Sequence, residues 1–160
     1  MIEAAHKQQT AALYRGRSAE VLLVDDSRGD ALLAVHAFRE ATITTQVTIA
    51  STGEMALEIL RQEGEYGGKI LPDIVLLDMC LPRMSGLDVL KTIKSDQRLK
   101  HIPVIVMSGS GAGNNVMGAY QHHANAYLMK PAGMTEYRTA IALVEQFFFV
   151  MAALPAANDG

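Results

Sequence analysis

Five short strand-like runs, most of them continuously apolar and each followed by a helical pattern, constrain the fold of this chain more than any other feature. The third run, DIVLLD, is a clear example, because four consecutive apolar residues lead directly to Asp78. A strand that is apolar on both faces must be covered on both faces, which is typical of parallel sheets. Strands that alternate with helices therefore predict an α/β domain, with one parallel sheet between two helical layers.

The pattern from Glu20 onward predicts five strand–helix units in succession. The second helix is expected to begin after a capping threonine, Thr52, and to close at Gly64. We expect a folded domain over residues 20–150, preceded by an N-terminal arm (1–19) that is loosely held or a short helix, and followed by a C-terminal tail (151–160). The expected strands are 20–27, 44–51, 73–78, 102–108 and 125–131, and the expected helices are 30–41, 52–64, 85–95, 114–123 and 134–154.

Composition excludes several classes of protein. The formal net charge is −3 and no lysine or arginine cluster stands out, so the chain lacks the basic surface that nucleic acids require. The single cysteine, Cys80, permits no intramolecular disulfide and favours a reducing compartment. The N-terminus does not resemble a secretion signal, and the apolar run FFFVMAALP is too short to span a bilayer. We therefore expect a cytoplasmic protein that binds neither nucleic acid nor membrane.

Polar side chains stand where the expected strands end. Asp25 and Asp26 follow the first strand, Asp78 ends the third, Ser108 ends the fourth and Lys130 ends the fifth. The carboxyl ends of parallel strands meet at one edge of a sheet, where such folds bind ligands. Three carboxylates held together repel one another and need a cation, and hard oxygen ligands suit Mg²⁺. A nearby lysine and hydroxyl could hold phosphoryl oxygens.

Taken singly, each of these residues has a simpler interpretation. An aspartate after a strand is often a turn former or a helix cap. Ser108 alone would be a loop hydroxyl, and Lys130 alone a solvated surface charge. The glycine-rich loop SGSGAG matches neither common phosphate-binding motif. His122 and His123 are adjacent and face different sides of a helix, which favours a surface position over a metal site. The joint pattern at five strand ends carries the argument.

Four segments together resemble the receiver domains of two-component response regulators. They are VDDS, LLDMCLPRMSG, VMSG and YLMKP, and the resemblance covers about residues 20–150. It implies a flavodoxin-like, doubly wound, five-stranded parallel sheet of order 2-1-3-4-5 with five helices. Two further segments, GDALLAVHAF and VEQFFFVMAALP, are similar to single-domain regulators that serve phytochrome-type, light-sensing histidine kinases. The resemblance implies signalling through protein–protein interaction, with a sensor histidine kinase as the phosphoryl donor.

The resemblance also implies a metal site. Asp26 would be a direct Mg²⁺ ligand, and Asp25 would assist through water or as a further ligand. The phosphoacceptor Asp78 would be a third ligand, and Cys80 would contribute its backbone carbonyl rather than its thiol.

Three further roles are implied by the same resemblance. Ser108 occupies the position of a conserved hydroxyl that hydrogen-bonds the phosphoryl group. Lys130 would pair with Asp78 at rest and with the phosphoryl group afterwards, and the Lys130–Pro131 bond is expected to be cis. Tyr127 occupies the position of an aromatic switch that moves together with Ser108. The chain departs from the commonest pattern by carrying serine instead of threonine at position 108.

Two alternatives remain open. A phosphohydrolase of similar topology would also use an aspartyl phosphate, but such enzymes need a second acid two residues after the nucleophile, where this chain has Cys80. A receiver-like scaffold that never accepts phosphate is the other. We expect a signalling receiver, not a metabolic enzyme, since only about ten residues follow the last helix. Three consecutive aromatics, Phe147–Phe149, cannot all face one core, so we also expect a homodimer through the C-terminal helix. The alternative is that residues 1–19 or 151–160 fold back over these aromatics.

Overall fold

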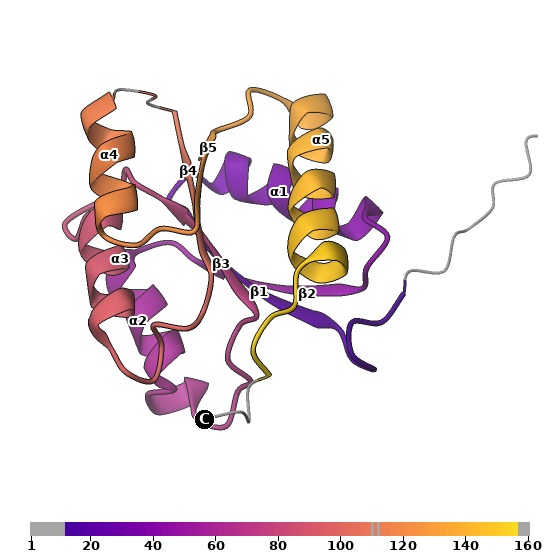
Figure 1. Cartoon of the computed structure of the whole chain (residues 1–160), viewed down its shortest axis with the longest axis horizontal. Coiled ribbons are helices and arrows are strands. Elements are labelled where there is room, and N and C mark those ends of the chain that lie inside the picture. The colour runs from indigo at the N-terminus through magenta and orange to yellow at the C-terminus, as the bar shows by residue number, and fades with distance from the viewer. Residues whose placement is uncertain (1–11, 110, 112, 157–160) are drawn as a thin grey trace, which may run out of the picture.

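A five-stranded parallel sheet forms the centre of the protein, in the order β2-β1-β3-β4-β5 (Figure 1). The computed structural model describes residues 12–109, 111 and 113–156. Helices α1 and α5 pack together on one face of the sheet, and α2, α3 and α4 cover the other (Figure 1). The expected fold class and strand order are confirmed.

The regular elements fall within or close to the expected segments. The strands are β1 (Ala19–Val24), β2 (Thr45–Ala50), β3 (Ile74–Asp78), β4 (Val104–Ser108) and β5 (Ala126–Met129). The helices are α1 (Arg28–Glu40), α2 (Gly53–Arg61), α3 (Gly86–Ser95), α4 (Gly113–Gln121) and α5 (Met134–Glu145), with a 3-10 turn η1 (Gly64–Tyr66) and a π-helical turn η2 (Gln146–Met151).

The central strands explain why the sequence runs are continuously apolar. Alternate residues of a strand point to opposite faces. In β3, Ile74 and Leu76 pack in the layer below α1 and α5, whereas Val75 and Leu77 pack in the layer below α2, α3 and α4. All four are fully buried. This central strand is therefore sandwiched between two hydrophobic layers, and only its end is free to carry a polar group.

The second helix ends earlier than expected. We predicted a stop at Gly64, but α2 ends at Arg61, and Gln62 adopts the left-handed conformation with a φ of 57°. The backbone N–H of Gln62 donates to the carbonyls of Glu58 and Ile59, which closes the helix there. Gly64 instead begins η1, with a φ of 55° that glycine adopts without strain.

The described part of the N-terminal arm is neither loose nor helical, so that expectation was wrong for residues 12–18. Tyr14 and Arg17 form an antiparallel bridge, and Ala12 pairs with Ile43. The Tyr14 side chain is buried, and its ring lies 5.0 Å from that of Phe149. A contact between residues so distant in sequence leaves no local pattern to read. The remainder of the arm, residues 1–11, lies outside the described residues.

The end of the last helix departs from α-helical geometry. We expected a helix to residue 154, but α5 gives way at Gln146 to the π-helical turn η2. Phe148 and Phe149 are both buried there, whereas Phe147 is 58% exposed. The expectation that at least one of the three aromatics points outwards is confirmed. Within the described residues, no helix combines the length and the apolar composition that crossing a bilayer requires.

Candidate functional site

The structure brings the predicted polar side chains to one edge of the sheet. Asp25 follows β1, Asp78 ends β3 and Ser108 ends β4. In the register of the sheet, Asp78 lies beside Met107 and Ser108 lies beside Met129, so these strands end level with one another. Lys130 follows directly after β5, and its backbone N–H donates to the carbonyl of Ser108 at 2.8 Å.

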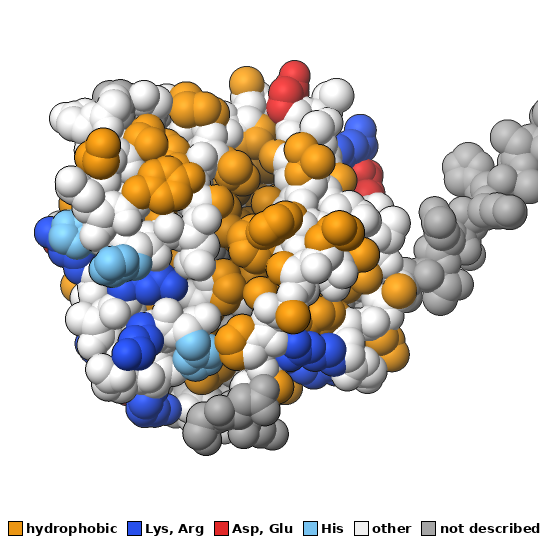
Figure 2. Space-filling model, in the orientation of Figure 1, with side chains coloured by type: hydrophobic (Ala, Val, Ile, Leu, Met, Phe, Trp, Pro, Cys, Tyr) orange, Lys and Arg blue, Asp and Glu red, His pale blue; other side chains and the backbone are white. Residues whose placement is uncertain are grey.

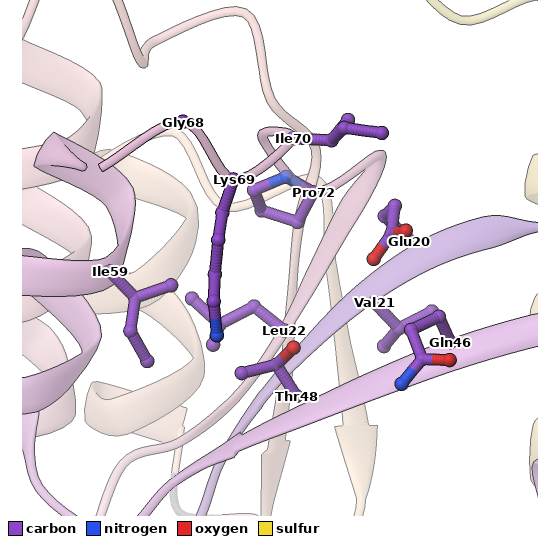
Figure 3. A pocket seen from close by; sticks show the side chains of 10 residues that line it. All are labelled: Glu20, Val21, Leu22, Gln46, Thr48, Ile59, Gly68, Lys69, Ile70 and Pro72. Atoms are coloured by element: carbon purple, nitrogen blue, oxygen red, sulfur yellow. The ribbon is translucent and has the colours of Figure 1, made fainter. Parts of the chain in front are cut away.

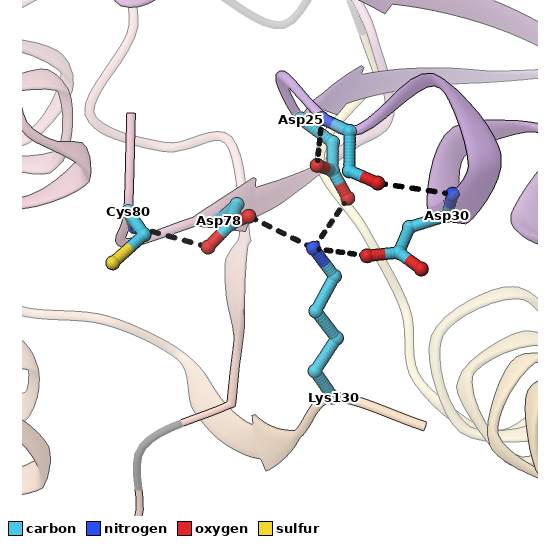
Figure 4. A network of polar contacts seen from close by, with 6 residues as sticks. Asp25, Asp30, Asp78, Cys80 and Lys130 are labelled. Atoms are coloured by element: carbon cyan, nitrogen blue, oxygen red, sulfur yellow. Dashed lines mark hydrogen bonds and ion pairs between the residues drawn. The ribbon is translucent and has the colours of Figure 1, made fainter. Parts of the chain in front are cut away.

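Lys130 lies at the centre of this edge. Its Nζ atom is 2.9 Å from an Oδ2 atom of each of Asp25, Asp30 and Asp78 (Figure 4). Burial disfavours the ammonium form, but hydrogen bonds with Asp30, Asp25 and Asp78 more than offset it and raise the pKa of Lys130. The lysine is therefore held charged among carboxylates that come from β1, α1 and β3.

Asp30 is the residue that the sequence reasoning missed. It lies in the first turn of α1, where its backbone N–H donates to the capping Ser27 Oγ at 3.3 Å. Its place in the first turn of the helix after β1 is a signal in the sequence that could have identified it. The first turn of a helix that follows a parallel strand lies over the same sheet edge as the end of that strand. An acidic residue there stabilises the helix terminus, and this ordinary role concealed its contact with Lys130.

Asp78 is fixed by contacts to both of its carboxylate oxygens. Oδ2 accepts from Lys130, and Oδ1 accepts from the backbone N–H of Cys80 at 3.0 Å (Figure 4). Asp78 is buried, with an exposed fraction of 6%, whereas Cys80 is exposed. The contact from Cys80 is made by its backbone and not by its thiol. Metal coordination by the Cys80 carbonyl stays a prediction.

The acidic side chains fit a divalent cation. Asp25, Asp26 and Asp78 each offer a carboxylate oxygen, and these atoms all lie within 4.8 Å of one another. Asp25 is buried and Asp26 is exposed, so such a cation would have protein oxygens on one side and room for water on the other. Burial raises the pKa of Asp25, an effect that its hydrogen bond with Lys130 opposes in part. A hard cation at this point would relieve the repulsion among the three carboxylates.

The loop after β3 is pinned against the end of that strand. The backbone N–H of Gly86 donates to the carbonyl of Met79 at 3.0 Å. A Cβ atom on Gly86 would lie 2.2 Å from the Asp78 carbonyl oxygen and 2.5 Å from the Met79 Cα. Gly86 is the first residue of α3. Its principal role is to permit this close approach, which sets the backbone of Asp78.

Ser108 and Tyr127 occupy neighbouring strands. The Ser108 side chain is buried at the end of β4. Tyr127 lies on β5 opposite Val106, and it packs against the core layer below α2, α3 and α4. Its backbone N–H donates to the Tyr120 hydroxyl at 3.2 Å. Tyr127 is therefore not among the side chains that surround Lys130.

The expected cis bond before Pro131 was wrong. Among the described residues no peptide bond is cis, so Lys130–Pro131 is trans. An X–Pro bond prefers trans by only about 0.5–1 kcal/mol, so a family tendency towards cis does not force the isomer in each member.

One hollow in the described part of the protein is separate from this cluster. It has a volume of about 370 Å³ and lies at the opposite edge of the sheet, where the strands begin (Figure 3). Its lining includes Glu20 and Gln46, each the second residue of its strand, and Pro72, which precedes β3. Lys69 reaches into it from the segment after η1 (Figure 3). None of the predicted site residues lines it.

Comparison with known proteins gives a consistent result. Residues 21–142 match the response regulator receiver domain family. Response regulator Rcp1 of Synechocystis sp. is 35% identical over 137 residues, which cover 86% of this chain and 93% of that protein. The crystal structure of the phosphorylated cyanobacterial phytochrome response regulator RcpA matches with a TM-score of 0.83 and 36% identity, covering 87% of this chain and 99% of the other. The Mn²⁺-bound form of Rcp1 matches with a TM-score of 0.80 and 34% identity, over 86% and 99%.

Proposed function

The chain belongs to the response regulator receiver domain family, and from this membership we propose that Asp78 accepts a phosphoryl group from a sensor histidine kinase. The observation that carries the proposal is the position of Asp78, which lies at the carboxyl edge of the sheet with Lys130 on one oxygen and three further acidic side chains nearby. We assign the receiver to residues 20–150, with an arm before it and a tail after it.

The proposed reaction transfers the phosphoryl group between two side chains. An Asp78 oxygen forms the new P–O bond, and the P–N bond of the kinase phosphohistidine breaks, with its electron pair staying on the imidazole nitrogen. Such transfers depend mainly on positioning and on charge stabilisation. Lys130 moves from the Asp78 oxygen to a phosphoryl oxygen, and the Ser108 hydroxyl donates to another. Water later cleaves the acyl phosphate, so the chain catalyses only its own phosphorylation and dephosphorylation.

We propose Mg²⁺ as the cation of this site. The oxygens of Asp25, Asp26 and Asp78, with the Cys80 carbonyl, would hold it, and it would neutralise charge on the phosphoryl oxygens. The proximity of three carboxylate oxygens to one another supports the assignment. Receiver domains bind divalent metal, and a related regulator is known in an Mn²⁺-bound form.

Phosphorylation would act as a switch. We propose that Ser108 moves towards the phosphoryl group and that Tyr127 changes rotamer as space opens behind it. Ser108 ends β4 and Tyr127 lies on the neighbouring strand β5, where it is only partly buried, so its ring has room to move. The phosphoryl group then shifts an equilibrium between two existing conformations.

The partners follow from the surface and from the relatives. We propose a phytochrome-type kinase as the phosphoryl donor, since a cyanobacterial phytochrome response regulator is among the most similar structures. Figure 2 shows apolar side chains gathered between α4 and α5. We propose that a second copy of this chain covers the part formed by the C-terminal helix and η2. Its large exposed apolar residues are Leu143, Phe147, Val150 and Met151.

Two further assignments complete the proposal. We place the protein in the cytoplasm, where its kinase partner would phosphorylate it. We assign it no nucleic-acid or membrane partner, because its net charge is −3 and signalling through protein contacts needs neither.

Intact mass spectrometry tests the phosphoryl transfer. The protein is incubated with acetyl phosphate and Mg²⁺, alongside Asp78→Asn and a sample with EDTA. We expect one phosphoryl adduct on the wild type and none on either control. The absence of an adduct from both acetyl phosphate and a cognate kinase would instead favour a phosphate-independent scaffold. Sedimentation at tens of micromolar tests the dimer, and a monomer with and without phosphorylation would exclude it.

A further inference from the structure

The hydrogen-bonding capacity of Lys130 is fully used at rest. An ammonium group has three N–H donors and no acceptor. Its three carboxylate partners, Asp25, Asp30 and Asp78, each lie at 2.9 Å. A phosphoryl oxygen can therefore gain a hydrogen bond from Lys130 only if one of these three contacts is released.

Two of the three contacts change when the protein is phosphorylated with a cation bound. Phosphorylation consumes an oxygen of Asp78 and changes the charge beside the lysine. Asp25 belongs to the group of acidic side chains that can share a cation, so a bound cation competes with the ammonium for it. In the part of the chain that the structure describes, that group comprises Asp25, Asp26 and Asp78 and does not include Asp30.

Asp30 is held in place through the start of α1. It lies on α1, and the helix start is fixed by Ser27, whose Oγ accepts from the Asp30 N–H at 3.3 Å. The Ser27 N–H in turn donates to Asp25 Oδ1 at 2.9 Å. The Asp30 side chain is 36% exposed, against 6–7% for those of Asp25 and Asp78, so it stands at the rim of the site (Figure 4).

We propose that Asp30 is a positioning residue that keeps the Lys130 ammonium beside the phosphoryl position while Asp25 and Asp78 are engaged by other groups. The proposal rests on the function proposed above, with Asp78 as phosphoacceptor. The contact with Asp30 persists while the ammonium moves from the Asp78 carboxylate to the phosphoryl oxygen. Without it, Lys130 is held only by charges that the reaction changes.

The first test is the rate at which acetyl phosphate phosphorylates Asp30→Asn at saturating Mg²⁺. Asparagine keeps the size of the side chain and removes its charge. We expect the rate constant at saturating acetyl phosphate to fall about tenfold, the size expected for loss of one charge-assisted hydrogen bond. The half-saturating acetyl phosphate concentration should change little. Asp30→Glu, which restores the carboxylate, should recover most of the rate.

Asp88 offers a matched control. It lies at the same position of α3 as Asp30 does of α1, and its N–H donates to the capping Ser85 Oγ at 3.1 Å. The ion-pair partners of Lys130 among the described residues do not include it. Asp88→Asn thus removes the same charge from the same helix position, and we expect its rate to stay within about twofold of the wild type.

A double-mutant cycle shows whether Asp30 acts through the lysine. In a Lys130→Met background, Asp30→Asn should have no further effect on the rate. An equal loss in both backgrounds, or a rate for Asp30→Asn that matches Asp88→Asn, would overturn the proposal. If Lys130→Met reacts too slowly to measure, the rate of Asp30→Glu is the deciding measurement. Failure of Asp30→Glu to recover the rate would also overturn the proposal. A wild-type protein that forms no adduct would instead overturn the phosphoacceptor function itself.

Discussion

Two groups of charged side chains, at opposite edges of the sheet, differ in how their charges balance. At the edge where the strands begin, Arg17 binds Asp73 through two hydrogen bonds, Nη2 to Oδ1 at 2.8 Å and Nη1 to Oδ2 at 2.9 Å. The Glu20 backbone N–H also donates to Asp73 Oδ2 at 2.8 Å. One cation meets one anion, and both carboxylate oxygens are satisfied within the protein. Such a pair joins the N-terminal turn to the segment before β3.

At the edge where the strands end, the charges do not balance. Lys130 contacts Asp25, Asp30 and Asp78, and Asp26 lies close to two of them. This edge holds one ammonium and four carboxylates, so the folded protein has an excess of negative charge in a partly buried place. Such an excess costs stability unless a cation relieves it. The difference teaches that balanced charges mark a structural contact, whereas unbalanced charges mark the edge that we propose takes a cation and a phosphoryl group.

The largest expected effect comes from changing the backbone beneath the unbalanced group. In Gly86→Ala, the new Cβ would lie 2.2 Å from the Asp78 carbonyl oxygen, and neither backbone segment can yield easily. We expect a loss of about 3 kcal/mol in the free energy of unfolding, measured by urea denaturation. Gly29→Ala is the matched control, because nothing lies within 4 Å of its Cβ position. Equal stability of the two variants would contradict the close approach.

Breaking the balanced pair should have the next largest effect. Asp73→Ala leaves the Arg17 guanidinium and the Glu20 N–H without their partner. We expect about 2 kcal/mol of destabilisation, below the range for fully buried pairs because the Arg17 side chain is 31% exposed. Urea denaturation measures it. The phosphorylation rate should not change, and a large change in that rate would show that the two edges are coupled.

Removing one charge from the unbalanced group should have a smaller effect of opposite sign. Burial raises the pKa of Asp25 above its ordinary value of 3.8, so the folded state disfavours the ionised carboxylate. We expect Asp25→Asn to stabilise the metal-free protein at pH 7, by less than Gly86→Ala or Asp73→Ala destabilises it.

The raised pKa of the Asp25 carboxylate also predicts that the free energy of unfolding depends on pH. Between pH 3.8 and its raised pKa, Asp25 binds more protons in the folded than in the unfolded state. Its contribution to stability is therefore present at low pH and is lost as the pH rises through this window. The stability advantage of Asp25→Asn should shrink as the pH is lowered towards 4. Urea denaturation in EDTA at several pH values measures this, and a constant difference would contradict the pKa direction.

The smallest effect sharpens the comparison with an exposed pair. Arg138 and Glu40 join α5 to α1, but both side chains are about half exposed. Solvent screens such a pair, so it resembles the balanced pair in charge but not in burial. We expect Arg138→Gln to leave the urea midpoint unchanged within error. A loss as large as that of Asp73→Ala would show that burial is not what separates the two pairs.

Much of the fold was predictable from local sequence patterns. Strands that are covered on both faces appear in the sequence as apolar runs. The five strands, and the helices that alternate with them, could therefore be assigned. The gathering of Asp25, Asp78, Ser108 and Lys130 at one edge followed from parallel topology alone. Their chemical roles remain predictions that the proposed experiments test.

The contacts that local patterns miss are those between distant segments. Asp30 looks like an ordinary acidic residue in a first helical turn, and its contact with Lys130 joins α1 to the residue that follows β5. The buried ring of Tyr14 meets Phe149 across most of the chain. The need for glycine at position 86 arises from the approach of its loop to β3. None of these contacts has a period or a spacing that a single sequence displays.

The sequence by itself determined the layers of the fold and the edge at which polar groups collect, because burial on both faces of a strand leaves only its ends for charge. Only the tertiary structure decided how those charges are shared. Hydrogen-bonding distances depend on how α1 sits over the sheet, and this packing brings Asp30 into contact with Lys130. The same packing distinguishes a balanced pair at one edge from an excess of carboxylates at the other, because charge balance is a property of neighbours in space.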